Sequence, residues 1–410
     1  GYFVNTTAGA ISVNLPAGTA GAVVAIKDYA NTFDTNACTL VQNGSDKIGG
    51  STVNAILSTE GLAVTLVYID STQGWLVTDD GLQSVADNNP YIVATGGTIT
   101  CSGDYRIHTF TGPGTFCVSN AGNPSGSNTT DYMVVAGGGG AAISASGGGG
   151  AGGFRESSGA ASGCYTASPL GACVSALPVT VTGYPITVGS GGAGVLAPAG
   201  CSSDATPGNN SIFSTITSQG GGGSVGIGDT TPTDPADLSA GAGGSGSGGS
   251  AGSGITGTLL ARSGNTPATP VSQGNPGGAG LQSPPWFMGG GGGGATAAGG
   301  DGTPTPSIST ASAKGGDGAT TSISASPTTY GGGGGGGTYL NAPTTVYGPT
   351  GGGGSGGGGA GGQFGGPPYP NNGTAGTANT GGGGGGSIGG GSYAGGSGGS
   401  GIVIIRYKFQ

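Results

Sequence analysis

Long runs of consecutive glycines dominate the chain from about residue 137 to residue 400. Two of them, 331–337 and 381–386, contain no other residue. Collagen is excluded, because glycine does not recur here as every third residue. A glycine run has no side chains to pack, and it loses more backbone entropy on ordering than any other sequence. It is therefore either a flexible coil or an ordered structure in which the backbone itself makes the contacts.

The ordered alternative requires a specific backbone geometry. Glycine runs can form a left-handed helix with three residues per turn and no internal hydrogen bonds. The N–H and C=O groups of such a helix point outward and need partners on neighbouring segments. Because glycine has no Cβ, several of these polyglycine II helices can approach closely enough to bond to one another. Each bond contributes about 0.5–1.5 kcal/mol net, so many must form together to offset the entropy.

The rest of the sequence favours the ordered alternative. By composition alone, 105 glycines and 24 prolines in 410 residues are typical of low complexity. However, only 6% of the residues are charged, whereas solvated coils typically carry a high net charge. The runs also end at inserts with aromatic residues, such as 284–288 and 338–340. We therefore expect an ordered polyglycine II bundle over 137–401, with helices threaded up and down and joined by loops at two opposite ends.

The charge balance excludes two classes of partner. The eight Lys and Arg residues are scattered between Lys27 and Lys408, against 17 Asp and Glu residues. Nucleic-acid binding requires a clustered basic surface, which this pattern does not offer. No apolar run approaches the roughly 20 residues that span a bilayer. Residue 1 is not Met, and no signal-peptide pattern follows it. We expect neither nucleic-acid binding nor membrane insertion.

Residues 1–88 have the composition of an ordinary small β-module. Helical periodicity is absent, apart from a candidate helical turn at 54–58. Apolar–polar alternation between turn-forming residues predicts strands at 10–16, 21–27, 63–69 and 74–78.

Residues 89–410 form the predicted second domain, in which β-strands enclose the glycine runs. The turn Gly112-Pro113-Gly114 predicts that the strand after it returns along the strand before it. The apolar C-terminal segment 402–410 is typical of a buried strand, and we expect it to pair with 131–135 and so clamp both ends of the glycine-rich part. Strands are predicted within 89–136 at 91–94, 98–101, 105–110, 114–118 and 131–135.

The six cysteines leave two alternatives open. No Cys-x-x-Cys pair exists, so zinc ribbons and thioredoxin-type redox sites have no support. Cys101 and Cys117 flank one hairpin-like segment, and Cys164 and Cys173 close a short loop, so both pairs are candidate disulfides. Free thiols are the alternative.

Five segments follow one another in a recognisable order between about 95 and 407: Ile107-His-Thr-Phe-Thr-Gly-Pro-Gly-Thr-Phe-Cys-Val118, Asp131-Tyr-Met-Val-Val-Ala-Gly-Gly-Gly-Gly140, Gly147-Gly-Gly-Gly-Ala-Gly-Gly-Phe-Arg155, Asn210-Ser-Ile-Phe-Ser-Thr-Ile-Thr217 and Gly398-Gly-Ser-Gly-Ile-Val-Ile-Ile-Arg-Tyr407. Their succession resembles the glycine-rich domain of bacteriophage tail-fibre proteins. Residues 1–88, with Ile26-Lys-Asp-Tyr-Ala30 and Gly74-Trp-Leu-Val77, are similar to a β-module that precedes such domains in phage fibres.

This resemblance implies a fold and a function. In the related tip adhesins of T-even-like phages, glycine helices form a rigid sandwich, and loops at its distal end carry the specificity for a host-surface receptor. The inserts depart from that family because they are rich in Pro and Thr, poor in aromatic residues, and include cysteines. The resemblance therefore leaves open which inserts form the tip.

Catalytic and metal sites find little support. His108 is the only histidine, so a His-dependent nucleophilic site has to include it, yet it lies within an alternating strand. Glu60 and Glu156 are the only glutamates, and nothing in their placement favours a glycosidase pair. The aspartates Asp79, Asp80, Asp229, Asp234 and Asp237 lack calcium-loop spacing. We expect no enzyme activity, cofactor or metal.

Aromatic inserts are the better candidates for binding, because Tyr and Trp are favoured at recognition hot spots. The alternative is that they cover the open edges of the glycine bundle. With the resemblance, they predict a non-enzymatic tail-fibre adhesin of the virion, outside cells, that contacts a glycan or outer-membrane protein, other virion proteins and, as a trimer, copies of itself. A structural fibre or extracellular filament without receptor contact is the alternative. The candidate receptor-binding residues are Trp286, Phe287, Met288, Tyr339, Tyr347 and Tyr369.

Overall fold

The computed structural model is an all-β protein with 31% strand and 1% helix. It divides into two compact units, Gly1–Asn89 and Pro90–Gln410, next to the boundary predicted at 88/89. The structure describes residues 1–82, 90–124, 126–163, 165–196, 204–226, 241–251, 260–283, 286–303, 313–340, 351–363, 371–389 and 392–410.

The N-terminal unit consists of two small sheets. Segment 54–58, for which the sequence suggested a helical turn, instead contains a strand, because residues 55–57 pair antiparallel with β4 (Cys38–Val41). One sheet has the order β1-β3-β6-β7, with β1 (Tyr2–Val4), β3 (Val23–Asp28), β6 (Leu62–Asp70) and β7 (Gly74–Leu82). The other has the order β2-β4-β5, with β2 (Ile11–Asn14), β4 (Cys38–Val41) and β5 (Ala55–Leu57).

Apolar side chains from both sheets form the core of this unit. Phe33 and Trp75 are fully buried, and the ring of Tyr68 meets Trp75 edge-on at 5.5 Å between centroids. The buried carboxylate of Asp28 accepts hydrogen bonds from the backbone N–H groups of Phe33 and Gly61. This is an ordinary side-chain core.

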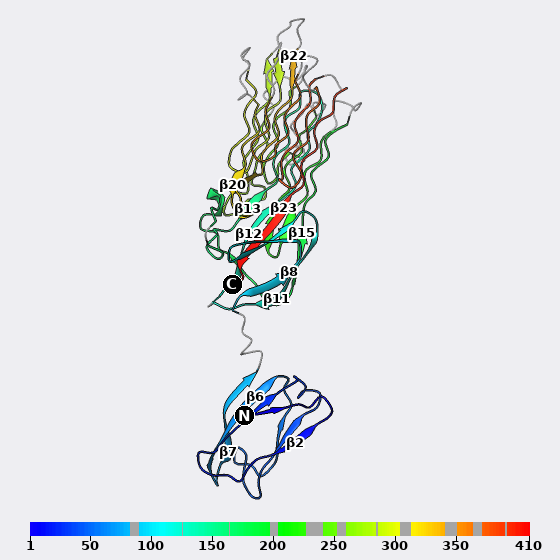
Figure 1. Cartoon of the computed structure of the whole chain (residues 1–410). Coiled ribbons are helices and arrows are strands. Elements are labelled where there is room, and N and C mark those ends of the chain that lie inside the picture. The colour runs from blue at the N-terminus through cyan, green and yellow to red at the C-terminus, as the bar shows by residue number, and fades with distance from the viewer. Residues whose placement is uncertain are drawn as a thin grey trace. The chain divides into compact units, whose positions relative to one another are not determined.

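The C-terminal unit begins with two larger sheets, here called the base (Figure 1). A cluster of apolar residues from both sheets, including Phe116, Phe213 and Tyr407, lies at its centre. The first sheet has the order β13-β12-β23-β10-β9, with β14 (Leu177–Pro178) also paired to β12; its strands are β9 (Thr98–Ser102), β10 (Tyr105–Phe110), β12 (Thr129–Val135), β13 (Phe154–Glu156) and β23 (Ile402–Lys408). The second has the order β17-β16-β15-β11-β8, with β8 (Ile92–Thr95), β11 (Gly114–Ala121), β15 (Gly183–Thr187), β16 (Ser211–Phe213) and β17 (Ile216–Ser218).

The predicted pairing of the C-terminal strand with 131–135 is confirmed. β12 and β23 are antiparallel neighbours, with Val134 opposite Val403. The predicted pairing of 105–110 with 114–118 is wrong. β10 already has β9 on one side and β23 on the other, so β11 pairs with β8 and β15 in the second sheet. The turn at 112–114 thus joins two sheets.

Short elements interrupt the glycine-rich part. A 3₁₀ turn, η1 (Pro169–Gly171), follows β13. Two small antiparallel sheets are formed by β18 (Leu281–Ser283), β19 (Trp286–Met288) and β22 (Thr338–Leu340), and by β20 (Ala319–Thr321) and β21 (Thr328–Tyr330).

The glycine runs are joined to one another by backbone hydrogen bonds, and residues 147–153, here called the central run, show the pattern best. Its successive N–H groups donate to three neighbouring segments in turn, and every third residue returns to the same segment. Gly148 and Ala151 donate to Gly290 and Gly293, Gly149 and Gly152 to Gly384 and Gly381, and Gly150 and Gly153 to Gly222 and Gln219.

The carbonyl groups of the central run accept from three further segments. Their donors are the N–H groups of Ser245 and Gly248, of Gly334, and of Ala136 and Gly139. The central run therefore has six neighbours, and all of these contacts are made by backbone. The spacing leaves no room for a side chain at many positions: a Cβ added at Gly149 would lie 2.2 Å from the carbonyl oxygen of Gly139.

Candidate functional site

The glycine runs have two structurally different ends. At one end they continue into β12, β13 and β23 of the base, and at the other they reach the small sheet of β18, β19 and β22, here called the cap sheet (Figure 1). The register of the runs agrees: Ala136 bonds to Gly153 beside the base, whereas Gly337 bonds to Ser146 beside the cap sheet. The predicted binding residues at 286–288 and 339 belong to the cap sheet.

The cap sheet packs an aromatic cluster against the ends of the glycine runs. Phe287 is 3% exposed and contacts Ala145 and Ala251. The ring of Tyr339 lies 6.0 Å from that of Phe287 at an interplanar angle of 34°. Tyr339 also covers the backbone of Gly389, where an added Cβ would lie 2.5 Å from the tyrosine ring. These side chains close the edge of the glycine-rich part.

The candidate receptor-binding residues fall into three groups. Phe287 and Met288 are buried, which supports the alternative that they cover the edge of the glycine runs. Tyr339 is half-buried, and Trp286 is placed by its backbone pairing with Leu340. Tyr347 and Tyr369 lie outside the described residues. Receptor contact by any of the six residues stays a prediction.

Two exposed leucines near the same end were not singled out from the sequence. Leu196 is 76% exposed. It follows Val195, whose N–H donates to the carbonyl oxygen of Ala141, the residue directly after the run 137–140. Leu260 is 61% exposed and lies two residues before Arg262, whose N–H donates to the carbonyl oxygen of Ser247. For Leu196, the signal available in the sequence was a large aliphatic residue close to the end of a glycine run.

His108 lies in the core of the base. It is fully buried in β10, with Nδ1 2.7 Å from the carbonyl oxygen of Gly96 and Nε2 3.0 Å from the hydroxyl of Tyr407. Its ring stacks on Tyr407 and meets Phe116 edge-on. Burial lowers the pKa of His108, and the charge of Arg106 acts in the same direction. A buried, neutral imidazole with both nitrogens engaged is part of the base core.

Two buried carboxylates hold the loop after β13 onto the base. Asp131 accepts hydrogen bonds from the hydroxyls of Ser157 and Ser162, and also from the backbone N–H groups of Gly159 and Ser162. Glu156 accepts from the N–H of Ser168 and the hydroxyl of Thr321. Burial raises the pKa of Glu156. Because structural donors occupy both carboxylates, Asp131 and Glu156 are not arranged as a catalytic pair.

The cysteines that the structure describes are free thiols. Cys101 and Cys117 lie on β9 and β11, which belong to different sheets, and both are exposed. Cys173 is an exposed free thiol as well, while its candidate partner Cys164 lies outside the described residues.

The described part of the chain contains no cluster of three or more His, Cys, Asp or Glu side chains that could hold a metal ion. In the same residues, no helix is long and apolar enough to cross a membrane.

Comparison with known proteins gives one match. No curated protein matches the chain. A family model described as a glycine-rich domain matches residues 110–408, from the last residue of β10 to the last residue of β23. This match spans the base strands from β11 onward, all of the glycine runs and the C-terminal strand, and leaves out β8, β9 and most of β10. The chain therefore belongs to the glycine-rich domain family.

Proposed function

We propose that the chain is a bacteriophage tail-fibre adhesin, which attaches the virion to a host-surface receptor without catalysing a reaction. On this proposal the C-terminal unit is the adhesin, and the N-terminal β-module connects it to other fibre or virion proteins. The receptor is a glycan or an outer-membrane protein, and the fibre context allows a homotrimer.

The scaffold of this adhesin is a bundle of polyglycine II helices. The support is the hydrogen-bonding period of three in the central run, in which Gly148 and Ala151 donate to one neighbour, Gly149 and Gly152 to a second, and so on. A helix with three residues per turn and no internal bonds has this periodicity. Six neighbouring segments correspond to a hexagonal arrangement of such helices.

The observation that carries the function is a pair of exposed aliphatic side chains at the end of the runs opposite the base. The base end is fixed by hydrogen-bonded strands and buried carboxylates such as Asp131. The opposite end presents Leu196 and Leu260, two strongly exposed aliphatic side chains in a chain with only 6% charged residues. Exposed apolar side chains on a rigid support are typical of recognition surfaces.

A cell-binding experiment tests the proposal. The purified full chain, fluorescently labelled, is added to a panel of bacteria, and on strains that bind it the unlabelled chain is used to compete with phage adsorption. We expect saturable binding and loss of adsorption. The double variant Leu196→Ser/Leu260→Ser should bind about tenfold more weakly, as expected for removal of apolar anchors.

The matched control is Val181→Ser. Val181 is 64% exposed like the two leucines, but it lies between β14 and β15 of the base. It should bind cells as the unchanged protein does. If the folded protein binds no strain and does not block adsorption on the phage's own host, the adhesin proposal fails, and the structural fibre or filament becomes the better account.

A further inference from the structure

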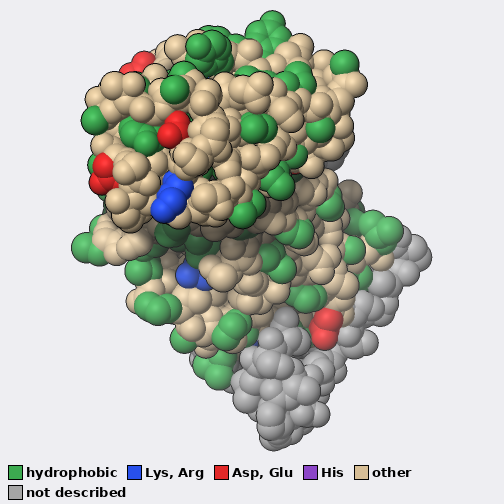
Figure 2. All heavy atoms as spheres, turned by 90° about the horizontal axis from the view of Figure 1, so that it is seen from below, with side chains coloured by type: hydrophobic (Ala, Val, Ile, Leu, Met, Phe, Trp, Pro, Cys, Tyr) green, Lys and Arg blue, Asp and Glu red, His purple; other side chains and the backbone are tan. Residues whose placement is uncertain are grey.

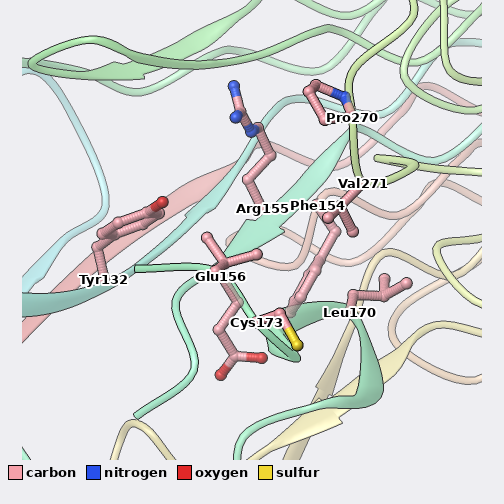
Figure 3. Close-up of a pocket in the computed structure, with 9 residues that line it drawn as sticks. Tyr132, Phe154, Arg155, Glu156, Leu170, Cys173, Pro270 and Val271 are labelled. Carbon is pink, nitrogen blue, oxygen red and sulfur yellow. The ribbon is translucent and has the colours of Figure 1, made fainter. Parts of the chain in front are cut away.

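A cavity of about 270 Å³ lies beside β13, an edge strand of the first base sheet. It is separate from the cap sheet and from the two exposed leucines of the proposed receptor contact. Its walls are mainly apolar and come from β12, β13, the residues at 170–174 and the segment at 270–271 (Figure 3). Apolar walls with a few polar groups at fixed positions are typical of small-molecule sites. The polar groups at this cavity therefore decide what it can bind.

The charged side chains beside the cavity are already engaged or lie on the other face of β13. Figure 3 shows Phe154 and Glu156 on one side of the β13 ribbon and Arg155 on the opposite side. The Glu156 carboxylate accepts from the N–H of Ser168 and the hydroxyl of Thr321. Among the described residues that line the cavity, none thus offers an unoccupied charge on the Phe154 side. Because a buried charge without a partner is costly, this side favours a neutral ligand.

The outer edge of β13 presents backbone groups to its surroundings. In an antiparallel pair, alternate residues bond to the partner strand and the residues between them point away from it. The N–H of Ser157 donates to the carbonyl oxygen of Tyr132, the residue of β12 that faces it. The N–H and C=O groups of residues 154, 156 and 158 consequently point outward, away from β12.

The hydrogen bonding of this outer edge is interrupted at Glu156. The N–H of Phe154 donates to the carbonyl oxygen of Gln273, and the N–H of Ser158 donates to that of Val174. Within the part of the chain that the structure describes, no group bonds to the backbone N–H or C=O of Glu156 on this edge. Val174 and the segment at 270–271, which lie on the two sides of the gap, both line the cavity. The gap is therefore one residue long and lies at the cavity.

Both flanks of the gap are held in place by their own hydrogen bonds. Gln273 is fully buried, and its side chain accepts from the N–H of Gln219 and donates to the carbonyl oxygen of Pro267. On the other flank, the N–H of Val174 donates to the carbonyl oxygen of Gly171. Since both neighbouring positions along the edge are taken, a continuous additional strand does not fit, but a single residue does.

We propose that this cavity binds one neutral amino-acid unit with an aliphatic side chain, as found in N-acylated amino acid amides. Its C=O accepts from the N–H of Glu156, and its N–H donates to the C=O of Glu156. Facing residues of an antiparallel pair project to the same face, so the ligand side chain lies on the Phe154 side, beside Leu170. At roughly 30 Å³ per non-hydrogen atom, taken from liquid water, the cavity holds about nine such atoms, which suits one leucine unit.

An NMR titration of the full chain tests the ligand class, with N-acetyl-L-leucinamide as the probe. N-acetylglycinamide should bind at least tenfold more weakly, because it has no side chain to bury. The analogue methylated on the acetylated nitrogen should bind about tenfold more weakly, because it cannot donate to Glu156. Equal binding of all three compounds, or no binding of the leucine compound, would overturn the proposal.

A longer peptide distinguishes a single unit from an added strand. A blocked pentapeptide with leucine at its centre and glycine elsewhere should bind no more tightly than N-acetyl-L-leucinamide, because the edge positions beside Glu156 are occupied. Binding at least tenfold tighter would show that Gln273 and Val174 give way to a continuous strand, and the single-unit proposal would fail.

Hydrogen exchange at single amides locates the ligand in the unchanged protein. Without ligand, the amide of Glu156 should exchange faster than those of Phe154 and Ser158, which are hydrogen-bonded. Saturating N-acetyl-L-leucinamide should slow exchange at Glu156 and leave the other two rates as they were. Binding without any change at Glu156 would place the ligand elsewhere.

Two tryptophan variants connect the binding to the cavity. Val271 lines the cavity and is 40% exposed, so Val271→Trp should fill the space and abolish binding. Val181→Trp is the matched control, since Val181 is also exposed but does not line the cavity, and it should bind as the unchanged protein does. Unchanged binding by folded Val271→Trp would contradict the assignment. Should this variant fail to fold, the exchange rate at Glu156 in the unchanged protein still decides.

Discussion

The N-terminal unit and the glycine runs of the C-terminal unit bury their interiors in different ways. The N-terminal unit hides large side chains such as Phe33, Leu66 and Trp75 between two sheets. The glycine-rich part has almost no side chains to hide, and its interior consists of backbone groups bonded between neighbouring segments. Few charged side chains are visible on the face in Figure 2, as expected for a chain with 6% charged residues.

This difference determines which substitutions each unit tolerates. A side-chain core depends on volume, so it suffers when a large residue becomes small but accepts swaps of similar size. A backbone core depends on close approach, so it suffers when any atom is added at a tight position. The central run nevertheless contains Ala151, fully buried, so a methyl group is accepted where the neighbours leave room. The following predictions use this contrast.

The largest expected effect is on the side-chain core. Phe33→Ala should destabilise the N-terminal unit by about 3–5 kcal/mol, because it removes a fully buried aromatic ring and leaves a cavity. Calorimetric unfolding scans in the presence of urea should show the transition of this unit shifting, while the transition of the C-terminal unit stays where it is in the unchanged protein. A shift of both transitions would contradict two independent cores.

The converse change should damage the backbone core. Gly149→Ala adds one carbon that would lie 2.2 Å from the Gly139 carbonyl oxygen, and the neighbouring runs cannot separate without breaking their own bonds. We expect about 3 kcal/mol of destabilisation, at the upper end for overpacking, confined to the C-terminal unit in the same unfolding experiment. If the C-terminal unit of Gly149→Ala unfolded in the same transition as that of the unchanged protein, the glycine runs would not be tightly packed at this position.

Lowering the pH should change the stability of the two units differently. Because burial lowers the pKa of His108, the unfolded chain binds a proton below about pH 6.5 that the folded C-terminal unit does not. Its stability should therefore fall as pH drops below that value, by up to about 1.4 kcal/mol per pH unit. The N-terminal unit contains no histidine and lacks this contribution.

His108→Gln isolates this effect. The variant should lose the His-linked slope between pH 6.5 and 5, when the free energy of unfolding of the C-terminal unit is compared with that of the unchanged protein at each pH. The raised pKa of Glu156 acts in the opposite direction but is common to both proteins, so it cancels in the difference. An unchanged difference over this range would mean that His108 titrates normally in the folded state.

The smallest effect should come from a glycine outside the tight positions. In the part of the chain that the structure describes, no atom lies within 4 Å of where a Cβ on Gly352 would stand, and its φ is not in the left-handed region. Gly352→Ala should stabilise the C-terminal unit by about 0.4–1 kcal/mol by restricting the unfolded chain. It is the matched control for Gly149→Ala, and a comparable loss of stability in both variants would remove the distinction between tight and open positions.

Sequence patterns predicted those features that side chains encode. The apolar segments at 131–135 and 402–405 specified the clamp of β12 and β23, although they lie about 270 residues apart. The strand after the Gly-Pro-Gly turn was misassigned because the turn fixes a local reversal but not which distant strand competes for β10. The sequence shows where the glycine runs lie. It does not predict which neighbour each N–H group bonds to, because glycine has no side chain that distinguishes one neighbour from another.

The candidate sites show the same limit. The sequence placed Phe287 and Tyr339 at run ends, but their burial depends on Ala145 and Ala251 from other runs. The cavity beside β13 was not predicted, since its lining combines β12 and β13 with residues near 170 and 270.

Hydrogen exchange at the central run tests the central claim most directly. If the backbone lattice is the core, the amides of residues 148–153 should exchange only by global unfolding of the C-terminal unit, with protection equal to that of β12 and β23. Native-state exchange read by mass spectrometry or NMR measures this, and Gly149→Ala should reduce the protection across all six neighbouring segments together. Exchange of these amides at the rate of a free coil, while β12 and β23 remain protected, would contradict the account.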